Sequence, residues 1–196
     1  MNIFRLHIRP KSGEANPRKS FDYCLRNSIL GMGWVVGEAT SITWDDYLVK
    51  ATAKYGPNAL SLLSRVKYFR NKVQVDDLLW TRDADGKYYL AKVVKPWRYY
   101  ANHESIEADI ANICDCAIKA IPHADEVPGK IVACFRPRKT IQRIANDSCV
   151  RFSQHLWNQL SASEDYIITQ DGQVKLYSLL SSEDCEDALA DRKSVV

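Results

Sequence analysis

Hydrophobic and polar residues alternate with a period of two near the start of the chain. Over residues 2–9 this alternation places Phe4, Leu6 and Ile8 on one face, which predicts a strand with that face turned inward. Residues 28–37 form an apolar run interrupted by glycines. Such a run is typical of a buried strand that bulges or approaches another backbone closely.

A β-hairpin and two further strands are predicted downstream. Residues 73–81 and 88–97 flank an Asp-Gly turn, a sequence that favours a tight reversal between strands. Residues 110–121 and 130–135 are apolar enough to form strands as well. Residues 98–108 are polar and aromatic without a regular repeat, so we expect an irregular loop there.

Helical patterns flank these strands. Residues 44–55 predict a helix that Gly56 ends, and a second helix is predicted to begin at Asn58. Residues 150–161 carry an apolar stripe at helical spacing, and residues 140–144 are predicted to open another helix. Hairpins outnumber strand–helix–strand alternations, which favours an α+β class. We therefore expect a small, curved, mostly antiparallel sheet or partial barrel with flanking helices.

Length and charge define the expected domain organisation. The chain has 196 residues, 46% of them apolar, which suits one globular domain. Residues 163–196 hold eight acidic and three basic residues, and the preceding residues 1–162 carry +8 within the total of +3. We predict a basic body over 1–162 with an acidic C-terminal extension. No signal peptide or membrane span is recognised, so a cytoplasmic location without a membrane partner is expected.

Motifs for common chemistries are missing from the sequence. There is no glycine-rich phosphate loop, no zinc-protease motif and no hydrolase nucleophile motif. Cys114 and Cys116 form the one close cysteine pair, and a single intervening residue does not match the usual zinc spacing. On a strand these two side chains share a face and pack as small hydrophobes. We expect no enzymatic activity, no cofactor and no metal.

Aromatic residues carry the main functional signal. Trp34 follows a glycine-rich segment, and Trp97 and Tyr99 lie where the hairpin's second strand ends. Exposed indole rings can stack on a nucleic-acid base, although core packing explains a tryptophan equally well, as we expect for Trp44, Trp80 and Trp157. Asn102 and Asp109 are polar residues that could hydrogen-bond the edge of a flipped base. The basic residues predicted to bind phosphates are Arg136, Arg138, Lys139 and Arg143.

Three sequence blocks show a resemblance to a known family. They are Ile29-Leu-Gly-Met-Gly-Trp34, then Asp77-Leu-Leu-Trp-Thr-Arg82 with Tyr88-Tyr-Leu-Ala-Lys-Val93, and finally Trp97-Arg-Tyr99 with Ala108-Asp-Ile110 and Val127-Pro-Gly129. Together they resemble the EVE-like branch of the PUA superfamily, related to YTH domains. Such domains form the N-terminal reader of modification-dependent (type IV) restriction proteins.

The resemblance implies a PUA-like fold and an aromatic cage for a modified or flipped base. The positions that match the family pattern are Trp34, Trp97, Tyr99 and Asp109. A reader of this kind precedes a nuclease in restriction proteins, so the resemblance also suggests a separately encoded nuclease as partner.

The sequence therefore predicts a non-catalytic reader of a modified, flipped DNA base in a restriction or phage-defence setting. DNA is favoured over RNA. One alternative is a module of the same fold that binds modified RNA. Another is a protein-interaction or regulatory domain that does not bind nucleic acid.

Overall fold

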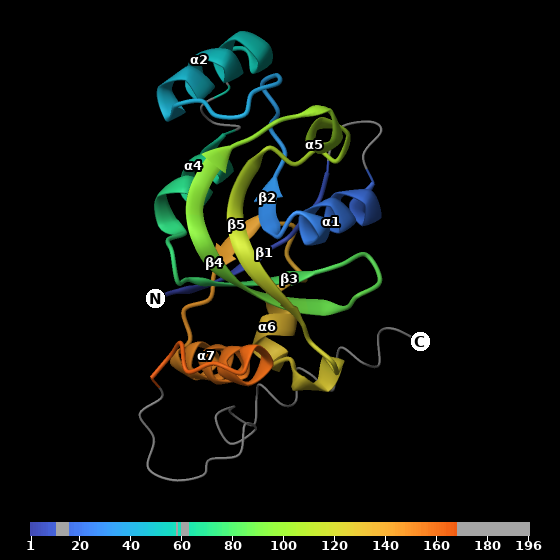
Figure 1. Cartoon of the computed structure of the whole chain (residues 1–196), viewed down its shortest axis with the longest axis vertical. Helices are drawn as coiled ribbons and strands as arrows, with labels where there is room; N and C mark the ends of the chain where they lie inside the picture. The colour runs from blue at the N-terminus through green and yellow to red at the C-terminus, as the bar shows by residue number, and fades with distance from the viewer. Residues whose placement is uncertain (11–15, 58, 60–62, 168–196) are drawn as a thin grey trace.

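The computed structural model describes residues 1–10, 16–57, 59 and 63–167 (Figure 1). Most of the predicted acidic extension and the predicted start of the helix at Asn58 lie outside the described residues. The first residues of the extension pack against the body. Asp165 accepts a hydrogen bond from the Trp157 indole at 2.8 Å, and the Tyr166 hydroxyl donates to the Asp76 carbonyl at 2.8 Å.

Six strands form one mixed, open sheet in the order β2-β5-β4-β3-β1-β6. The strands are β1 (Ile3–Leu6), β2 (Ile29–Met32), β3 (Leu78–Arg82), β4 (Tyr88–Tyr99), β5 (Asn112–Ala120) and β6 (Ile141–Arg143). β1 runs parallel to β3, and the other neighbouring pairs are antiparallel. The α+β class with flanking helices is confirmed, and the hairpin expected on the Asp-Gly turn is the β3–β4 pair.

Helices lie at both ends of this sheet. The helical segments are α1 (Pro17–Arg26), α2 (Trp44–Tyr55), α4 (Ser64–Lys72), α5 (His103–Glu107), the 3₁₀ turn η1 (Ala124–Glu126), α6 (Gly129–Cys134) and α7 (Asp147–Ser161). In Figure 1 the long strands β4 and β5 curve from the end that carries α2 and α5 to the end that carries α6 and α7. Each sheet face is covered by its own apolar cluster. Of the predicted packing tryptophans, Trp80 and Trp157 are buried in the cluster beside α7.

Capping residues explain where the helices begin. Asn16 accepts a hydrogen bond from the Lys19 amide at 2.9 Å, and Pro17 occupies the first turn, where its missing N–H costs nothing. Helix α1 therefore begins at Pro17. Thr43 caps α2, and Gly56 ends it with a φ of 79°. The predicted helix over residues 44–55 is confirmed.

Three other sequence predictions are wrong. Residues 130–135, expected as a strand, lie mostly in α6, because a short apolar run fits a buried helix as well as a strand. Residues 141–143, expected in a helix, form β6 because they pair with the edge of β1. The expected loop 98–108 instead contains the end of β4 and all of α5.

Strand β1 is covered on both faces rather than on one. Phe4 and Leu6 pack in one cluster as predicted, but Ile3 is equally buried in the other. Arg5 and His7 share the face of Ile3, and they are 0% and 8% exposed. Simple alternation predicted the strand but not the burial of Arg5 within it or of His7 just beyond its end.

Candidate functional site

A pocket of about 370 Å³ opens beside the segment that follows β2. It is called the Trp34 pocket below. The segment after β2 and the end of α2 supply most of its aromatic and apolar wall, while β1, α4, α5 and their neighbouring loops contribute the rest. The lining residues are Arg9, Met32, Gly33, Trp34, Val35, Lys54, Tyr55, Arg65, Ile106, Asp109 and Thr140.

Two of the lining residues have a left-handed backbone. The φ angles of Trp34 and Asp109 are 63° and 52°. This conformation costs a residue with a side chain roughly 1–3 kcal/mol, and it persists only where the surrounding structure imposes it. Both residues lie at the Trp34 pocket, whereas Ser28, Asp76 and Ala162 adopt the same conformation elsewhere in the described chain.

Side chains from distant elements hold the Trp34 segment in place. The Asn112 amide donates to the Gly33 carbonyl at 2.5 Å. The Tyr47 and Tyr55 hydroxyls donate to the carbonyls of Trp34 and Val35 at 3.0 and 2.6 Å. Burial is the main cause that raises the pKa of Tyr55 to about 12, so this phenol stays protonated at neutral pH. The wall of the pocket is thus fixed before any ligand enters.

The Trp34 ring forms an aromatic corner with Tyr55. The ring centroids lie 5.4 Å apart with an interplanar angle of 81°, an edge-to-face contact. Trp34 is only half-buried and packs against the core cluster on one side. An indole held in this way can offer a flat surface to a planar ligand.

Asp109 supplies a carboxylate to the same pocket. The residue is 9% exposed, and its side chain lies directly against the backbone of Gly33. A Cβ atom added at Gly33 would lie 2.7 Å from the Asp109 carboxyl carbon, so only glycine leaves room for this carboxylate. The sequence therefore needs glycine at position 33 for a packing reason that involves a pocket residue.

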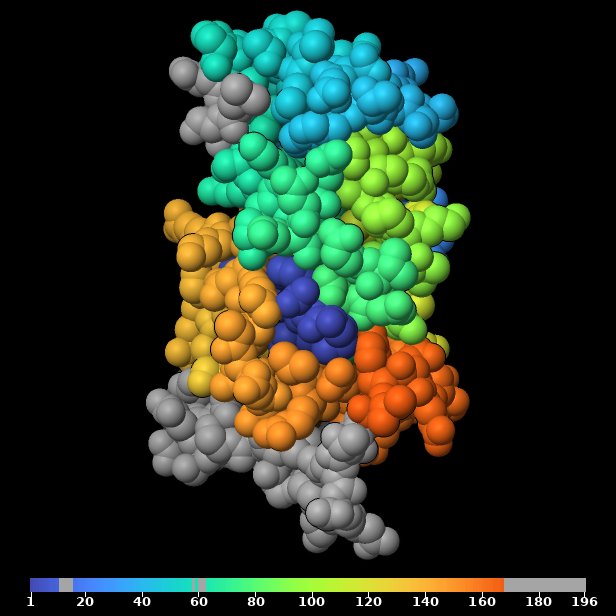
Figure 2. All heavy atoms as spheres, turned by 90° about the vertical axis from the view of Figure 1, so that its left-hand side faces the viewer, coloured from blue at the N-terminus to red at the C-terminus, as the bar shows by residue number. Residues whose placement is uncertain are grey.

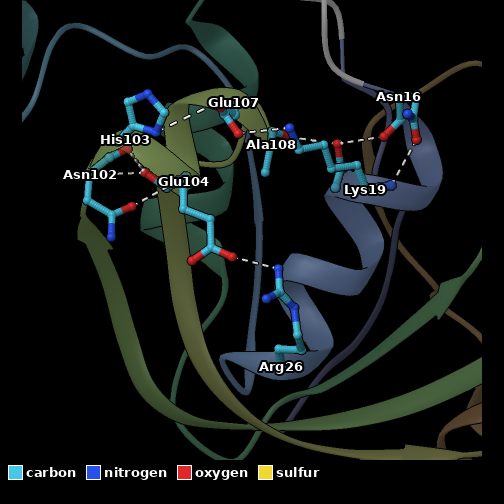
Figure 3. Close-up of polar contacts among 10 residues, drawn as sticks. Asn16, Lys19, Arg26, Asn102, His103, Glu104, Glu107 and Ala108 are labelled. Atoms are coloured by element: carbon cyan, nitrogen blue, oxygen red, sulfur yellow. Dashed lines mark hydrogen bonds and ion pairs between the residues drawn. The ribbon is translucent and has the colours of Figure 1, made fainter.

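Helix α5 positions Asp109 two residues beyond its end. Two ion pairs join α5 to α1, namely Lys19 with Glu107 at 2.8 Å and Arg26 with Glu104 at 2.6 Å (Figure 3). The buried Ser20 hydroxyl also donates to the Ala108 carbonyl at 2.6 Å. These contacts anchor the turn that presents the carboxylate.

Asn102 does not reach the Trp34 pocket. Its side-chain oxygen accepts a hydrogen bond from the Ser105 backbone amide at 2.9 Å, while the Ser105 hydroxyl accepts one from the Asn102 backbone amide at 2.8 Å. This reciprocal pair is a capping box at the start of α5. The expectation that Asn102 contacts a base is replaced by a structural role.

Trp97 and Tyr99 also lie outside the pocket. The Trp97 ring packs against Trp44 and Tyr47 at centroid distances of 5.4 and 6.2 Å. Tyr99 is 0% exposed, and its hydroxyl bonds to the segment after β2, donating to the Gly37 carbonyl at 2.7 Å. Trp97 and Tyr99, expected in one base cage with Trp34, are packed against neighbouring elements instead, because β4 continues through both of them.

Basic side chains continue from the Trp34 pocket onto the neighbouring surface. Arg65 also lines a second hollow of about 480 Å³, together with Lys139 and Arg143. Figure 2 shows α4 in green and the segment before α7 in orange on either side of the dark blue N-terminal residues. Arg136 and Arg138, expected to bind phosphates, line neither hollow.

Charge is distributed unevenly around these two hollows. Among the described residues that line them, the cations are Arg9, Lys54, Arg65, Lys139 and Arg143. Asp109 is the one acidic residue in the same set. The site thus combines an aromatic corner, one carboxylate and a basic rim.

The sequence did not predict four residues of the Trp34 pocket, namely Arg9, Lys54, Tyr55 and Arg65. Of these four residues, only Arg9 had a signal in the sequence, because the alternation over residues 2–9 places it on the same face as Arg5 and His7.

Within the described part of the chain, no group of three or more His, Cys, Asp or Glu side chains could hold a metal ion. Cys114 and Cys116 are both buried, and burial raises the pKa of each thiol. Every described helix is too short or too polar to cross a lipid bilayer.

Comparisons with protein-family models, curated proteins and solved structures found no match for this chain.

Proposed function

We propose that this chain is a non-catalytic nucleic-acid-binding protein that receives one extruded base in the Trp34 pocket. The proposal rests on one observation, the Trp34 pocket itself, in which an aromatic corner and a carboxylate lie within a basic rim. Its volume of about 370 Å³ falls within the range of roughly 300–1,000 Å³ found for small-ligand pockets.

Each part of the pocket has a matching role in base recognition. The Trp34 ring stacks on the face of the base, and Tyr55 closes the corner beside it. The Asp109 carboxylate accepts hydrogen bonds from amino or imino groups on the base edge. Arg9, Arg65 and Lys54 neutralise the flanking phosphates. The base cage therefore differs from the sequence prediction, with Tyr55 in the place expected for Trp97.

The choice of a modified DNA base rests on the family resemblance. The sequence blocks similar to EVE-like domains supply the glycine–tryptophan segment and the position of Asp109, both of which line this pocket. A PUA-like assignment, DNA rather than RNA, and a restriction or phage-defence setting with a separately encoded nuclease belong to the same proposal.

Binding to labelled duplexes that differ at one position tests the proposal. The duplexes carry cytosine, 5-methylcytosine, 5-hydroxymethylcytosine or N6-methyladenine at that position, and fluorescence anisotropy gives the affinity. We expect one modified duplex to bind best, and Trp34→Ala to weaken its binding by roughly tenfold to a hundredfold, since a stacked base contributes about 1–3 kcal/mol. Trp44→Ala is the matched control, because this half-buried indole does not line the pocket.

The same measurement separates the alternatives. Equal affinity for all duplexes, unchanged by Trp34→Ala, contradicts base recognition. Stronger competition by matched RNA oligomers favours the RNA-binding alternative. An absence of any salt-dependent binding favours a protein-interaction domain, because contacts to several phosphates weaken steeply as salt rises.

A further inference from the structure

A third hollow shares Arg9 with the Trp34 pocket. It has a volume of about 250 Å³ and is called the His7 hollow below. His7, Arg9 and Arg82 line its polar side, and Pro17 and Phe21 of α1 form an apolar wall. None of these residues was assigned a function from the sequence.

His7 lines this hollow and also carries a buried polar atom without a partner in the described chain. The residue is 8% exposed, and its Nδ1 atom has no hydrogen-bond partner among the described residues. Buried polar atoms are nearly always paired, so an unpaired one points to a ligand or a water. Burial, followed by the charges of Arg9, Arg5 and Arg82, lowers the pKa of His7 to about 4. The neutral ring can still donate one N–H to an anion.

Phe135 brings two guanidinium groups and the His7 ring close together. The guanidinium carbons of Arg5 and Arg82 lie 5.7 and 5.5 Å from the Phe135 ring centre, and the His7 ring lies 5.5 Å away. Arg5 is 0% exposed and donates to the Lys139 carbonyl and to the Gln142 side chain. Both of these partners are neutral groups.

Asp83, the acidic residue that lines the His7 hollow, does not neutralise the charges of Arg9 and Arg82. Asp83 lines the His7 hollow, but its Oδ1 atom accepts hydrogen bonds from the Asp85 and Lys87 amides at 2.9 and 2.8 Å. Its Oδ2 atom accepts one from the Tyr89 hydroxyl at 3.1 Å. Asp83 therefore serves the β3–β4 turn rather than pairing with the cations of the hollow.

We propose that the His7 hollow is a binding site for a phosphate oxyanion. The guanidinium groups of Arg82 and Arg9 donate to the phosphate oxygens, and the His7 ring donates its N–H. Arg9 lines both the Trp34 pocket and the His7 hollow, so the phosphate and a base in the Trp34 pocket can belong to one nucleotide unit. The origin of the phosphate, a polynucleotide backbone rather than free phosphate, rests on the proposed function.

Titration with inorganic pyrophosphate, followed by NMR of the histidine rings at constant ionic strength, tests the site. We expect the His7 signals to shift with saturation and the pKa of His7 to rise when the anion is bound. The exposed His103 and His123 serve as internal references on the same chain. Titration with chloride to the same ionic strength controls for screening.

Variants separate a built site from general positive charge. Arg82→Gln and Arg9→Gln each weaken pyrophosphate binding at least tenfold, whereas Arg151→Gln changes it less than twofold. Arg151 is the matched control because it is an exposed arginine on α7 that does not line the hollow. Arg9 is exposed, so its substitution keeps the test valid if Arg82→Gln fails to fold. No saturable His7 shift, or equal weakening by Arg151→Gln, overturns the proposal.

A short single-stranded oligonucleotide distinguishes the source of the phosphate. If it shifts the His7 signals and also binds through Trp34, both proposals hold. Oligonucleotide binding that requires Trp34 but leaves the His7 signals unmoved overturns the oxyanion site alone. A His7 response to pyrophosphate without any oligonucleotide binding supports the oxyanion site for a free phosphate and contradicts the proposed function.

Discussion

Trp34 and Trp97 are both half-buried, and both lie beside Asn112, but their surroundings differ. The Asn112 side chain accepts a hydrogen bond from the Trp97 indole at 3.3 Å and donates to the Gly33 carbonyl next to Trp34. Trp34 borders a pocket, whereas neighbouring rings and the Arg70 guanidinium, 5.7 Å from its ring centre, surround Trp97.

The difference arises from the backbone that carries each ring. Trp34 lies in a left-handed turn beside Gly33, whose missing side chain makes room for the Asp109 carboxylate. Trp97 lies on a strand, and the first turn of α2 brings Trp44 and Tyr47 against it. Partial exposure alone therefore does not identify a ligand-binding tryptophan. What matters is whether protein atoms already occupy the space beside the ring.

Replacing each indole in turn tests this contrast most strongly. We expect Trp97→Ala to lower the free energy of unfolding by about 2 kcal/mol, less than the ~3–5 kcal/mol typical of a fully buried ring. Its discrimination between modified and plain duplex is retained. Trp34→Ala shows the opposite pattern: it loses the discrimination between duplexes, and it lowers the free energy of unfolding less than Trp97→Ala does. Urea unfolding and anisotropy on both variants provide the check, and loss of discrimination in a stable Trp97→Ala protein breaks the contrast.

Gly33→Ala sharpens the account of the Trp34 side. The added methyl group collides with the Asp109 carboxyl group, so we expect a destabilisation of about 1–2 kcal/mol and weaker base binding. The cost in stability falls when Asp109 is also replaced by alanine, because the collision partner is then absent. Equal costs of Gly33→Ala in both backgrounds, measured by urea unfolding, would contradict this explanation.

Two arginines of α4 provide the smallest and most closely matched test. Arg65 lines the Trp34 pocket, while the Arg70 guanidinium lies 5.0 Å from the Trp44 ring centre. Arg65→Gln reduces the slope of log affinity against log salt by about 0.9, the value for one lost phosphate contact. Arg70→Gln leaves the slope unchanged and costs about 0.5–1 kcal/mol of stability. The same slope for both variants would show that Arg65 is not a phosphate contact.

Local signals predicted several elements of the fold correctly. Thr43 and Gly56 bound α2, and the Asp-Gly turn joins β3 to β4. Such signals act within a few residues, so they remain visible in the sequence. The glycine–tryptophan segment and Asp109, both expected in a base cage, line the same Trp34 pocket, while their contact with a base stays a prediction.

Contacts between distant segments decided the elements and site residues that the sequence did not predict. Residues 141–143 are a strand because β1 offers its edge to them, and Trp97 is packed because α2 folds onto it. Arg9, Tyr55 and Arg65 reach the Trp34 pocket from the segment after β1, from α2 and from α4, with no sequence spacing that links them.

By itself, the sequence determined the α+β class, the hairpin, the two ends of α2 and the basic body that follows from its composition. The tertiary structure alone decided which tryptophan borders a pocket, which cations surround it, and that Arg5 and His7 are buried beside Phe135. The physical reason is the distance along the chain over which each kind of contact acts. Caps and turns depend on neighbouring residues, whereas a pocket depends on how distant side chains share space after the chain has folded.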